Sequence, residues 1–572
     1  MILAMQWRVL VATYLTKVIA AVTYDYIIAG GGTSGLLLAI ALTASPNVTV
    51  AVLEAGGDGR QDARITVPEK EGSIQGSEYD WQLKTVPQQS LYNKPTQPVN
   101  RGKVLGGTSA MNYMIWNRAS TAEYDAWESV LGNTGWNWNT ISAACKASEH
   151  FFSPLQSVPA ATYNTAFHGS SGPIHSTMQR NTFTLYTDYL VPTLKTQKVP
   201  MPADRDGGTT TGAGPVPMSI DRDSYTRSYS ASAYTAIQSR PNLHVITGAT
   251  VARIAWGADA ADGSQVARGF RYRNTTSGST ASILVLGRQV ILSAGSIQTP
   301  QILETSGIGD PKILSPLGID TRVDLPAVGT GVQDKITYSG SFSFNINNFT
   351  GTQYVQTFLD YAPASRFLSP ADLATFKALL NSATAGPTMS QAAISMLKQM
   401  VATDQPLIEI GWFLAFTNVY LLHPLSCGTV HINTADPVAS PVIDPGYNSA
   451  MINGTSIDLW LLSKAISYMT TTLAKAAPFS NVGAKFSVDS TLSQSAIQTK
   501  VFQGIGIGQH WTGGAVMLPR QDGGVVDQNL LVYGTKNVRV IDSSIIPAVP
   551  GQHPMSLAYA IAMRAADVLS GS

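Results

Sequence analysis

Near its amino end the chain reads Tyr24-Asp25-Tyr26-Ile27-Ile28-Ala29-Gly30-Gly31-Gly32-Thr33-Ser34-Gly35, then an apolar run, then Val50-Ala51-Val52-Leu53-Glu54. This order is typical of a strand, a glycine turn, a helix and a second strand that ends in an acid. Gly30 and Gly32 allow the backbone to turn tightly and to approach a pyrophosphate, which rests on the N-terminal end of the following helix. The stretch therefore predicts a dinucleotide-binding unit.

Four further residues of this unit have predicted roles. Gly35 allows the helix to pack closely on the sheet. Glu54 lies nineteen residues past Gly35, where a carboxylate can accept hydrogen bonds from an adenosine ribose. Thr33 and Ser34 begin the helix beside the predicted pyrophosphate, so we expect both of them to contact the cofactor.

Length, charge and cysteine content limit the possible functions. With 572 residues the chain is too long for one compact core, so two closely joined domains are expected. Only 13% of the residues are charged and the formal net charge is +1, which offers no basic patch for nucleic acid. No later segment is apolar for long enough to span a bilayer, and no His or Cys pair has zinc-site spacing, so no metal is expected. Cys145 and Cys427 are equally compatible with one disulfide and with two buried thiols.

The amino end and several asparagines favour secretion. Residues 1–21 contain a basic residue, an apolar run and the small pair Ala20-Ala21, which is typical of a secretory signal peptide. Lys17 interrupts the apolar run, and a disordered or docked tail is the alternative interpretation. Glycosylation sequons add modest support; they begin at Asn47, Asn274, Asn348 and Asn453. We therefore expect a secreted glycoprotein.

The dinucleotide-binding features are scattered along the chain, which implies one domain built from discontinuous segments. We predict an α/β fold: a Rossmann-like dinucleotide-binding domain of residues 24–180, 236–334 and 516–572. Residues 181–235 and 335–515 are predicted to form an α+β substrate-binding domain with a large, mainly antiparallel sheet. Within it, the residue pattern predicts strands over 407–416 and 429–433 and a helix over 457–472.

Two more glycine-containing segments accompany the first. Residues 102–112 read Gly-Lys-Val-Leu-Gly-Gly-Thr-Ser-Ala-Met-Asn, in which Gly107 permits close backbone contact with a flat or phosphorylated ligand. Asn112 can hydrogen-bond such a ligand. Taken alone, this segment is more typical of a tight structural turn. Residues 295–309 follow a predicted strand and begin a helix, with Pro300 near its first turn.

With these segments the chain resembles the glucose–methanol–choline (GMC) oxidoreductases, a family of flavoenzymes. Both family signatures match, at residues 102–125 and 295–309, and within the family the chain is most similar to fungal aryl-alcohol oxidases and dehydrogenases and to patulin-synthase-like enzymes. The resemblance implies FAD as the cofactor. Some members attach FAD through a histidine in the glycine turn that corresponds to residues 106–110 of this chain. This turn contains no histidine, so non-covalent FAD is expected. Further cofactor contacts implied by the resemblance involve Thr108, Met114, Val251 and Asp542.

The same resemblance points to a catalytic pair, His510 and His553. Oxidation of an alcohol removes a proton from oxygen and a hydride from carbon, and neutral histidine is suited to accept that proton. We expect His510 to take the hydroxyl proton while hydride passes to flavin N5. His553 would hold the substrate oxygen, at the start of a helix whose positive end would face the flavin.

The substrate pocket departs from the aryl-alcohol oxidase pattern. Gln509 precedes His510 where those relatives carry an aromatic residue, which puts a purely aromatic pocket in doubt. Trp412 and Phe413 are candidates to line the pocket, although aromatic residues in a strand are more often part of the core.

The sequence thus predicts an FAD-dependent oxidase or dehydrogenase that converts a primary alcohol of an aromatic or furan-like small molecule to the aldehyde. Oxygen or a quinone would reoxidise the flavin, and the substrate itself and the oligomeric state are left open. Two alternatives stand beside this prediction: a glucose-type sugar oxidase or dehydrogenase, and a non-redox, FAD-containing cyclase of fungal secondary metabolism.

Overall fold

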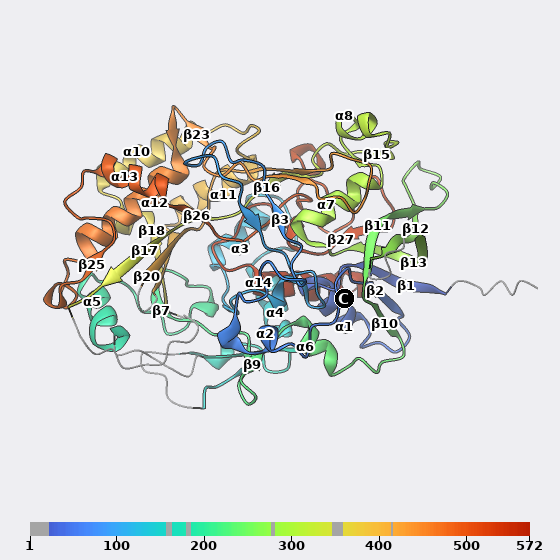
Figure 1. The fold of residues 1–572 in the computed structure, drawn as a ribbon, viewed down its shortest axis with the longest axis horizontal. Coiled ribbons are helices and arrows are strands. Elements are labelled where there is room, and N and C mark those ends of the chain that lie inside the picture. The colour runs from blue at the N-terminus through green and yellow to red at the C-terminus, as the bar shows by residue number, and fades with distance from the viewer. Residues whose placement is uncertain are drawn as a thin grey trace, which may run out of the picture.

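The computed structural model describes residues 22–155, 163–178, 185–275, 281–345, 358–412 and 416–571. Two large sheets, each covered by helices, lie beside one another (Figure 1). The predicted signal peptide, residues 1–21, lies outside the described residues. None of the described helices is long and apolar enough to cross a membrane.

The first sheet contains the predicted dinucleotide unit. Its parallel part joins β10 (Leu243–Ile246), β2 (Val50–Leu53), β1 (Thr23–Ala29), β13 (Ser282–Leu292) and β27 (Val538–Val540). Two antiparallel strands extend it, β12 (Ala267–Asn274) and β11 (Ala249–Trp256). β2 is buried at every position, as expected for a parallel strand covered on both faces.

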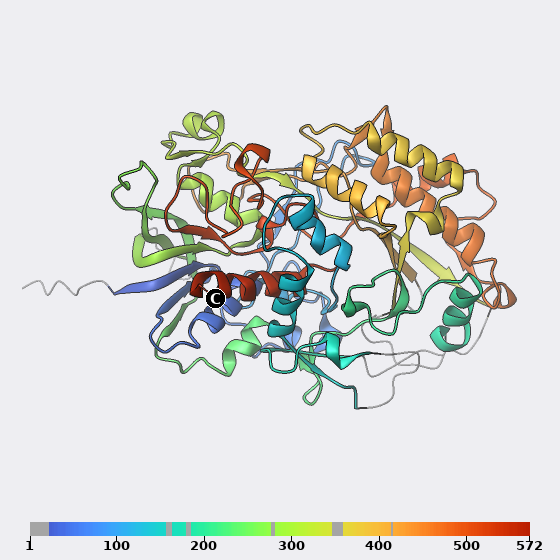
Figure 2. The same cartoon turned by 180° about the vertical axis from the view of Figure 1, so that it is seen from behind.

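Helix α1 (Thr33–Leu42) packs tightly beside the turn that follows β1, and Gly35 makes this possible. A Cβ atom at Gly35 would lie 2.1 Å from the carbonyl oxygen of Gly30 and 2.9 Å from the Cβ of Ser293. α14 (Met555–Ser570) lies against both α1 and α4 (Trp138–Ser148), as the view from behind shows (Figure 2). The predicted packing role of Gly35 is therefore realised.

The second sheet is antiparallel throughout its described pairings. Its order is β25 (Lys485–Phe486), β17 (Ile336–Ser343), β20 (Phe416–Leu421), β19 (Pro406–Trp412), β18 (Phe358–Pro363) and β7 (Gly212–Pro215), with β26 (Ile505–Ile507) also paired to β17. Helix α12 (Ile457–Tyr468) packs on β17 and β20. The fold is thus the predicted one: a Rossmann-like α/β part and an α+β part with a large antiparallel sheet.

Other described helices complete the two layers; they are α3 (Thr121–Ser129), α7 (Gly295–Thr305), α10 (Pro370–Asn381), α11 (Gln391–Ala402) and α13 (Gln494–Gln503). The predicted helix over 457–472 is α12, which continues as a π-helical turn over Met469–Leu473. The strand predicted over 429–433 forms as β21 (Gly428–His431), but it pairs with β16 (Thr330–Val332) and β22 (Val442–Asp444) in a separate small sheet. Residue patterns identify strands but do not say which strands pair.

The strands of the two sheets alternate along the chain. Those of the first sheet fall within 23–292 and 538–540, and those of the second within 212–215 and 336–507. The exact domain limits stay a prediction. Cys145 and Cys427 are both buried as free thiols, so of the two alternatives the structure has the unbridged one.

Candidate active site

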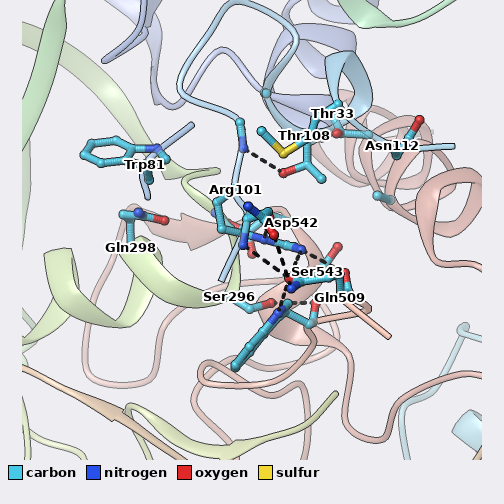
Figure 3. A pocket seen from close by; sticks show the side chains of 18 of the residues that line it. Thr33, Trp81, Arg101, Thr108, Asn112, Ser296, Gln298, Gln509, Asp542 and Ser543 are labelled. Carbon is cyan, nitrogen blue, oxygen red and sulfur yellow. Dashed lines mark hydrogen bonds between the residues drawn. The ribbon is translucent and has the colours of Figure 1, made fainter. Parts of the chain in front are cut away.

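A cavity of about 580 Å³ takes in the predicted cofactor turns and both predicted catalytic histidines. Its volume falls in the range of small-molecule and cofactor sites. Figure 3 shows Thr33, Thr108 and Asn112 on one side of the cavity, with Trp81 and Gln298 across from them. The predicted site residues that line it are Gly30, Gly32, Thr33, Ser34, Glu54, Gly107, Thr108, Asn112, Met114, Val251, Gln509, His510, Asp542 and His553.

The start of α1 is built to receive an anion. Gly32 is the N-cap residue, no side chain caps the helix, and its first turn carries no acid. The first backbone N–H groups of the helix therefore keep their hydrogen-bonding capacity and face the cavity with the positive end of the helix dipole. A Cβ atom at Gly32 would meet nothing closer than the Cα of Gly107, at 3.8 Å, so no side chain crowds this side of the turn.

The carboxylate of Glu54 holds the glycine turn by hydrogen bonds to two backbone amides. Its Oε2 accepts a hydrogen bond of 2.8 Å from the Gly31 amide, and its Oε1 accepts one of 2.8 Å from the Gly56 amide. Burial raises the pKa of the Glu54 carboxyl to about 7, against the opposing effect of these two amides. Glu54 also lines the cavity, and a carboxylate oxygen has a second lone pair, so a ribose contact remains a prediction.

Asp542 and Asn112 are held by the protein as well as facing the cavity. The Oδ2 of Asp542 accepts from the amide of Gly295, at 2.8 Å, and from the Thr299 hydroxyl, at 2.6 Å, both at the start of α7. Asn112 accepts at Oδ1 from the amide of Met114, which has a left-handed backbone with φ of 60°. These contacts fix the backbone that faces the cavity, whichever atoms of a ligand it meets.

Three glycines leave a cradle that suits a dinucleotide. Gly107 has φ of 54° and lies against Gly32, where a Cβ atom would approach the Gly32 Cα to 2.7 Å. Gly295 has φ of 83°, and a Cβ atom there would meet nothing within 4 Å. An uncapped helix start, close glycine backbones and a buried acid form the donor and acceptor set that a dinucleotide requires. The residues present therefore fit FAD.

At the far end of the cavity the two histidines face one another. The ring centroids of His510 and His553 lie 4.6 Å apart with an interplanar angle of 79°. Tyr420 on β20 stacks on His510 at 5.5 Å and presents its ring to that of His553 at 5.7 Å, with an angle of 65°. The tyrosine thus contacts both rings and limits how either can turn.

His553 is tied to a buried acid. Its Nε2 lies 2.9 Å from Oε1 of Glu409 on β19, and the other oxygen of Glu409 accepts from the Tyr361 hydroxyl at 2.7 Å. Burial acts to raise the pKa of Glu409, but His553, Lys335 and the Tyr361 hydroxyl outweigh it, so this pKa is lowered and the carboxyl is ionised. With Nε2 engaged, only Nδ1 of His553 is left for a ligand.

His510 is held by its backbone, not by its ring. Its amide donates to Asp334, while its Nδ1 is buried without a hydrogen-bond partner among the described residues. Burial lowers the pKa of His510 well below its usual range, and the positive charges of His553, Lys335 and Arg101 add to this effect. The ring is therefore neutral near pH 7, and its Nε2 can accept a proton.

Comparison with known proteins agrees with this geometry. The GMC oxidoreductase family matches the chain over residues 24–337 and again over residues 424–562. The protein belongs to the GMC oxidoreductase family. It is 32% identical over 580 residues to a glucose oxidase of Aspergillus carbonarius, covering 97% of this chain and 93% of the relative.

Solved structures extend the likeness to three dimensions. An FAD-dependent oxidoreductase from Chaetomium thermophilum matches with a TM-score of 0.87 and 28% identity, covering 96% of this chain and 99% of the other. A fungal aryl-alcohol oxidase matches with a TM-score of 0.82 and 25% identity, covering 96% and 98%. The protein is therefore an FAD-dependent GMC oxidoreductase.

Two of the three predicted substrate-binding residues are not found among the described residues of the cavity lining. Trp412 does not line the cavity: it is buried in an aromatic cluster, with its ring 5.8 Å from that of Phe342 and 5.9 Å from that of Phe479. β19 is buried at every position, so its sequence gives no alternation from which the cavity side could be read. Phe413 lies outside the described residues.

Gln509 lines the cavity, but its side chain serves the neighbouring backbone. Its Nε2 donates to the carbonyl of Pro98 at 2.8 Å, and its Oε1 accepts from the Trp511 indole at 3.1 Å. Arg101 donates to its carbonyl oxygen at 2.8 Å, as the dashed lines in Figure 3 show. The residue has φ of 59°, so this network holds a left-handed turn directly before His510.

No role was predicted from the sequence for Glu409, Tyr420 or the pair Asp334-Lys335. A signal existed for the first of these, because Glu409 is the one acid inside the apolar strand Pro406–Trp412. An acid at a fully buried strand position must have a specific partner. For Tyr420 and Asp334-Lys335 no local pattern pointed to the histidines.

A separate charged cluster lies outside the cavity lining. Ligand-type atoms of Glu149, His168 and Asp206 lie within 4.8 Å of one another. Arg118 pairs with Glu149 at 2.8 Å, and His168 lies 3.0 Å from Glu149 on one side and from Asp204 on the other. Hydrogen-bonded ion pairs account for this cluster, so it carries no metal assignment.

Proposed function

We propose that the protein oxidises a primary alcohol group of an aromatic or furan-like small molecule to the aldehyde, with non-covalently bound FAD. The observation that carries this proposal is the asymmetric histidine pair at the end of the cofactor cavity. Bound FAD supplies the acceptor for the two electrons and the hydrogen that leave the substrate carbon.

His510 is the base in this reaction. It is neutral, it lines the cavity, and its Nε2 is the ring nitrogen free to face a ligand. A hydroxyl group placed against Nε2 transfers its proton there as the C–H bond breaks. Tyr420 keeps the ring in place by stacking, since no hydrogen bond to Nδ1 does so among the described residues.

His553 orients the substrate oxygen and stabilises the charge that develops on it. With Nε2–H donating to Glu409, a hydrogen bond from Nδ1 to the substrate requires the doubly protonated ring. In that form His553 would offer a proton from Nδ1 to the substrate oxygen while His510 accepts one, which is the division of roles that alcohol oxidation needs.

The walls of the cavity support an apolar, flat substrate. The cavity lining includes apolar and aromatic residues from the second sheet; among them are Leu359, Phe416, Tyr420 and Ile507. The likeness to a fungal aryl-alcohol oxidase points the same way. For the cofactor, the turn at 106–112 has no histidine, which supports non-covalent binding.

A sugar substrate is the second candidate, supported by the glucose oxidase relative. Anaerobic mixing of the purified protein with a panel of aryl alcohols, furan alcohols and sugars decides between the two, because reduced flavin loses its visible absorption. Bleaching by aryl or furan alcohols supports the proposal, and bleaching by glucose alone replaces it with the sugar enzyme. Binding without any bleaching would leave the non-redox cyclase.

We also propose that the protein is secreted and glycosylated. Asn47 and Asn453 begin sequons and are exposed, whereas Asn348 lies outside the described residues. Protein recovered from a fungal host should begin near Ala21 to Tyr24 and lose mass on treatment with an N-glycosidase. An intact Met1 with no change in mass would indicate an intracellular enzyme.

A further inference from the structure

Directly behind the two histidines lies a buried dipeptide, Asp334-Lys335, that precedes β17. Asp334 is 3% exposed and the whole of Lys335 is 0% exposed. Neither residue lines the cavity. A buried acid and a buried lysine next to one another in sequence are costly unless each has specific partners.

Asp334 holds the segment that carries His510. Its carboxylate accepts hydrogen bonds from the backbone amides of both His510 and Gln509, the latter at 3.0 Å. The hydroxyl of Tyr447 donates to the same carboxylate at 2.6 Å. Because these bonds go to the main chain, they fix where the His510 backbone lies rather than how its ring turns.

Lys335 holds the segment that carries His553. Its Nζ donates to the carbonyl oxygen of Gln552 at 2.9 Å, one residue before the histidine. The side chain of Gln552 is fixed too: its Oε1 accepts from Ala119 and Tyr124. Asp334 and Lys335, which are adjacent in the chain, therefore hold the backbones of two different segments. The histidines that these segments carry are 43 positions apart (553 minus 510).

The charges around this dipeptide come from several elements. Carboxylates of Glu409 on β19, Glu123 on α3 and Asp334 itself face the ammonium group, and His423 also lies within its electrostatic reach. Burial lowers the pKa of Lys335 to about 8, against the effect of these three carboxylates, so the group is mostly protonated near pH 7.

The same ammonium group acts on His510. The groups that face this histidine are His553 and Arg101, which with Lys335 oppose a positive charge on it, and Tyr420, which stacks on it. Asp334 contacts its backbone amide. Lys335 thus adds a fixed positive charge behind a ring that must stay neutral to accept a proton.

We propose that Asp334 and Lys335 act as positioning residues that set the separation of His510 and His553, because each of them holds the backbone of one of the two segments. This inference rests on the proposed function, because it assigns His510 the role of the base. It assigns an effect on the reaction rate to two residues that do not line the cavity and act through the positions of the histidines.

The test compares Lys335→Met with wild type as FAD-loaded full-length proteins. Methionine keeps the apolar stem and removes the charge and the hydrogen bond to Gln552. Anaerobic flavin reduction should slow by about 10- to 100-fold, the size expected when a catalytic group is displaced by about 1 Å. The acid limb of its pH profile should move up by about one unit, because a positive charge near His510 has been lost. Lys335→Arg, which keeps the charge, should leave the limb in place.

A matched control removes the charge of a different lysine, which is paired with a carboxylate. Lys464 on α12 donates to Asp372 at 2.7 Å and does not line the cavity. Lys464→Met should leave both the reduction rate and the pH profile unchanged. A rate of flavin reduction in folded, FAD-containing Lys335→Met that equals that of wild type would overturn the proposal, and so would a slower rate with an acid limb that stays in place.

A second measurement is made on the wild-type protein and needs no turnover. In wild-type protein labelled with carbon-13 at the histidine Cε1, the resonance of His510, identified by its loss in His510→Gln, should report a neutral ring from about pH 6.5 upward. A charged His510 at neutral pH contradicts the inference even if the protein reduces its flavin. A neutral His510 in a protein that no alcohol reduces would instead contradict only the proposed function.

Discussion

Replacing Glu409 by glutamine tests whether the two histidines differ because of their partners. The structure predicts a specific loss, since the carboxylate holds Nε2 of His553 at 2.9 Å in a nearly fully buried position. A hydrogen bond between charged groups contributes roughly 1.5–3 kcal/mol. At about 1.4 kcal/mol for each factor of ten, Glu409→Gln should slow flavin reduction by roughly 10- to 150-fold. Glutamine keeps the length of the side chain and removes the negative charge beside His553.

The assay is anaerobic stopped-flow reduction at saturating alcohol, followed at the flavin absorption. Tyr361→Phe is the matched control, because it removes the other hydrogen bond to the same carboxylate, of 2.7 Å, and keeps the charge. Loss of an ordinary hydrogen bond costs about 0.5–1.5 kcal/mol, so this variant should slow reduction by no more than about tenfold. If Glu409→Gln reduces its flavin as fast as Tyr361→Phe or faster, the charge of Glu409 has no role in the reaction.

Further expected outcomes concern the base and the cofactor. His510→Ala should slow reduction by a factor of roughly 10²–10⁴ with FAD still bound; undiminished reduction would mean that another group is the base. Because burial places the pKa of His510 well below 6.5, the wild-type reduction rate should stay level down to about that pH and fall only in more acidic buffer. A loss centred at or above neutrality would contradict this sign. Glu54→Ala should weaken FAD binding by about 1.5–3 kcal/mol in a fluorescence titration. Acid should release all FAD from the wild-type protein, and flavin that remains on the denatured chain would indicate a covalent link.

The parts of the site that follow from local chemistry could be predicted from the sequence. A turn that needs Gly30 with φ of 103° and a helix that needs Gly35 at its point of contact leave a readable pattern, because few other residues can occupy those positions. His510 and His553 carry no such local pattern, and they were found through the resemblance to a family.

Contacts between distant segments could not be predicted in this way. Glu409 and His553 are 144 positions apart, and their pairing depends on how β19 lies against the segment that leads into the start of α14. Trp412 shows the same limit: a strand buried on both faces gives no alternation, so nothing in its sequence separates the cavity side from the core side. Which strands pair, and which face of each meets the cavity, are set by packing of the whole domain.

The arrangement of buried charges gives the two histidines different roles before any substrate arrives. His553 has a carboxylate on one ring nitrogen, whereas His510 has no hydrogen bond to its ring among the described residues and three positive groups nearby. The carboxylate of Glu409 holds the ring of His553 by a hydrogen bond, whereas burial and nearby positive charge oppose protonation of His510. The rings of the proposed donor and acceptor are thus held with their centroids 4.6 Å apart. The folded protein orders them in advance, so no further reorganisation is needed during the reaction. The chemistry of the pair therefore resides as much in Asp334, Lys335 and Glu409 as in the histidines themselves.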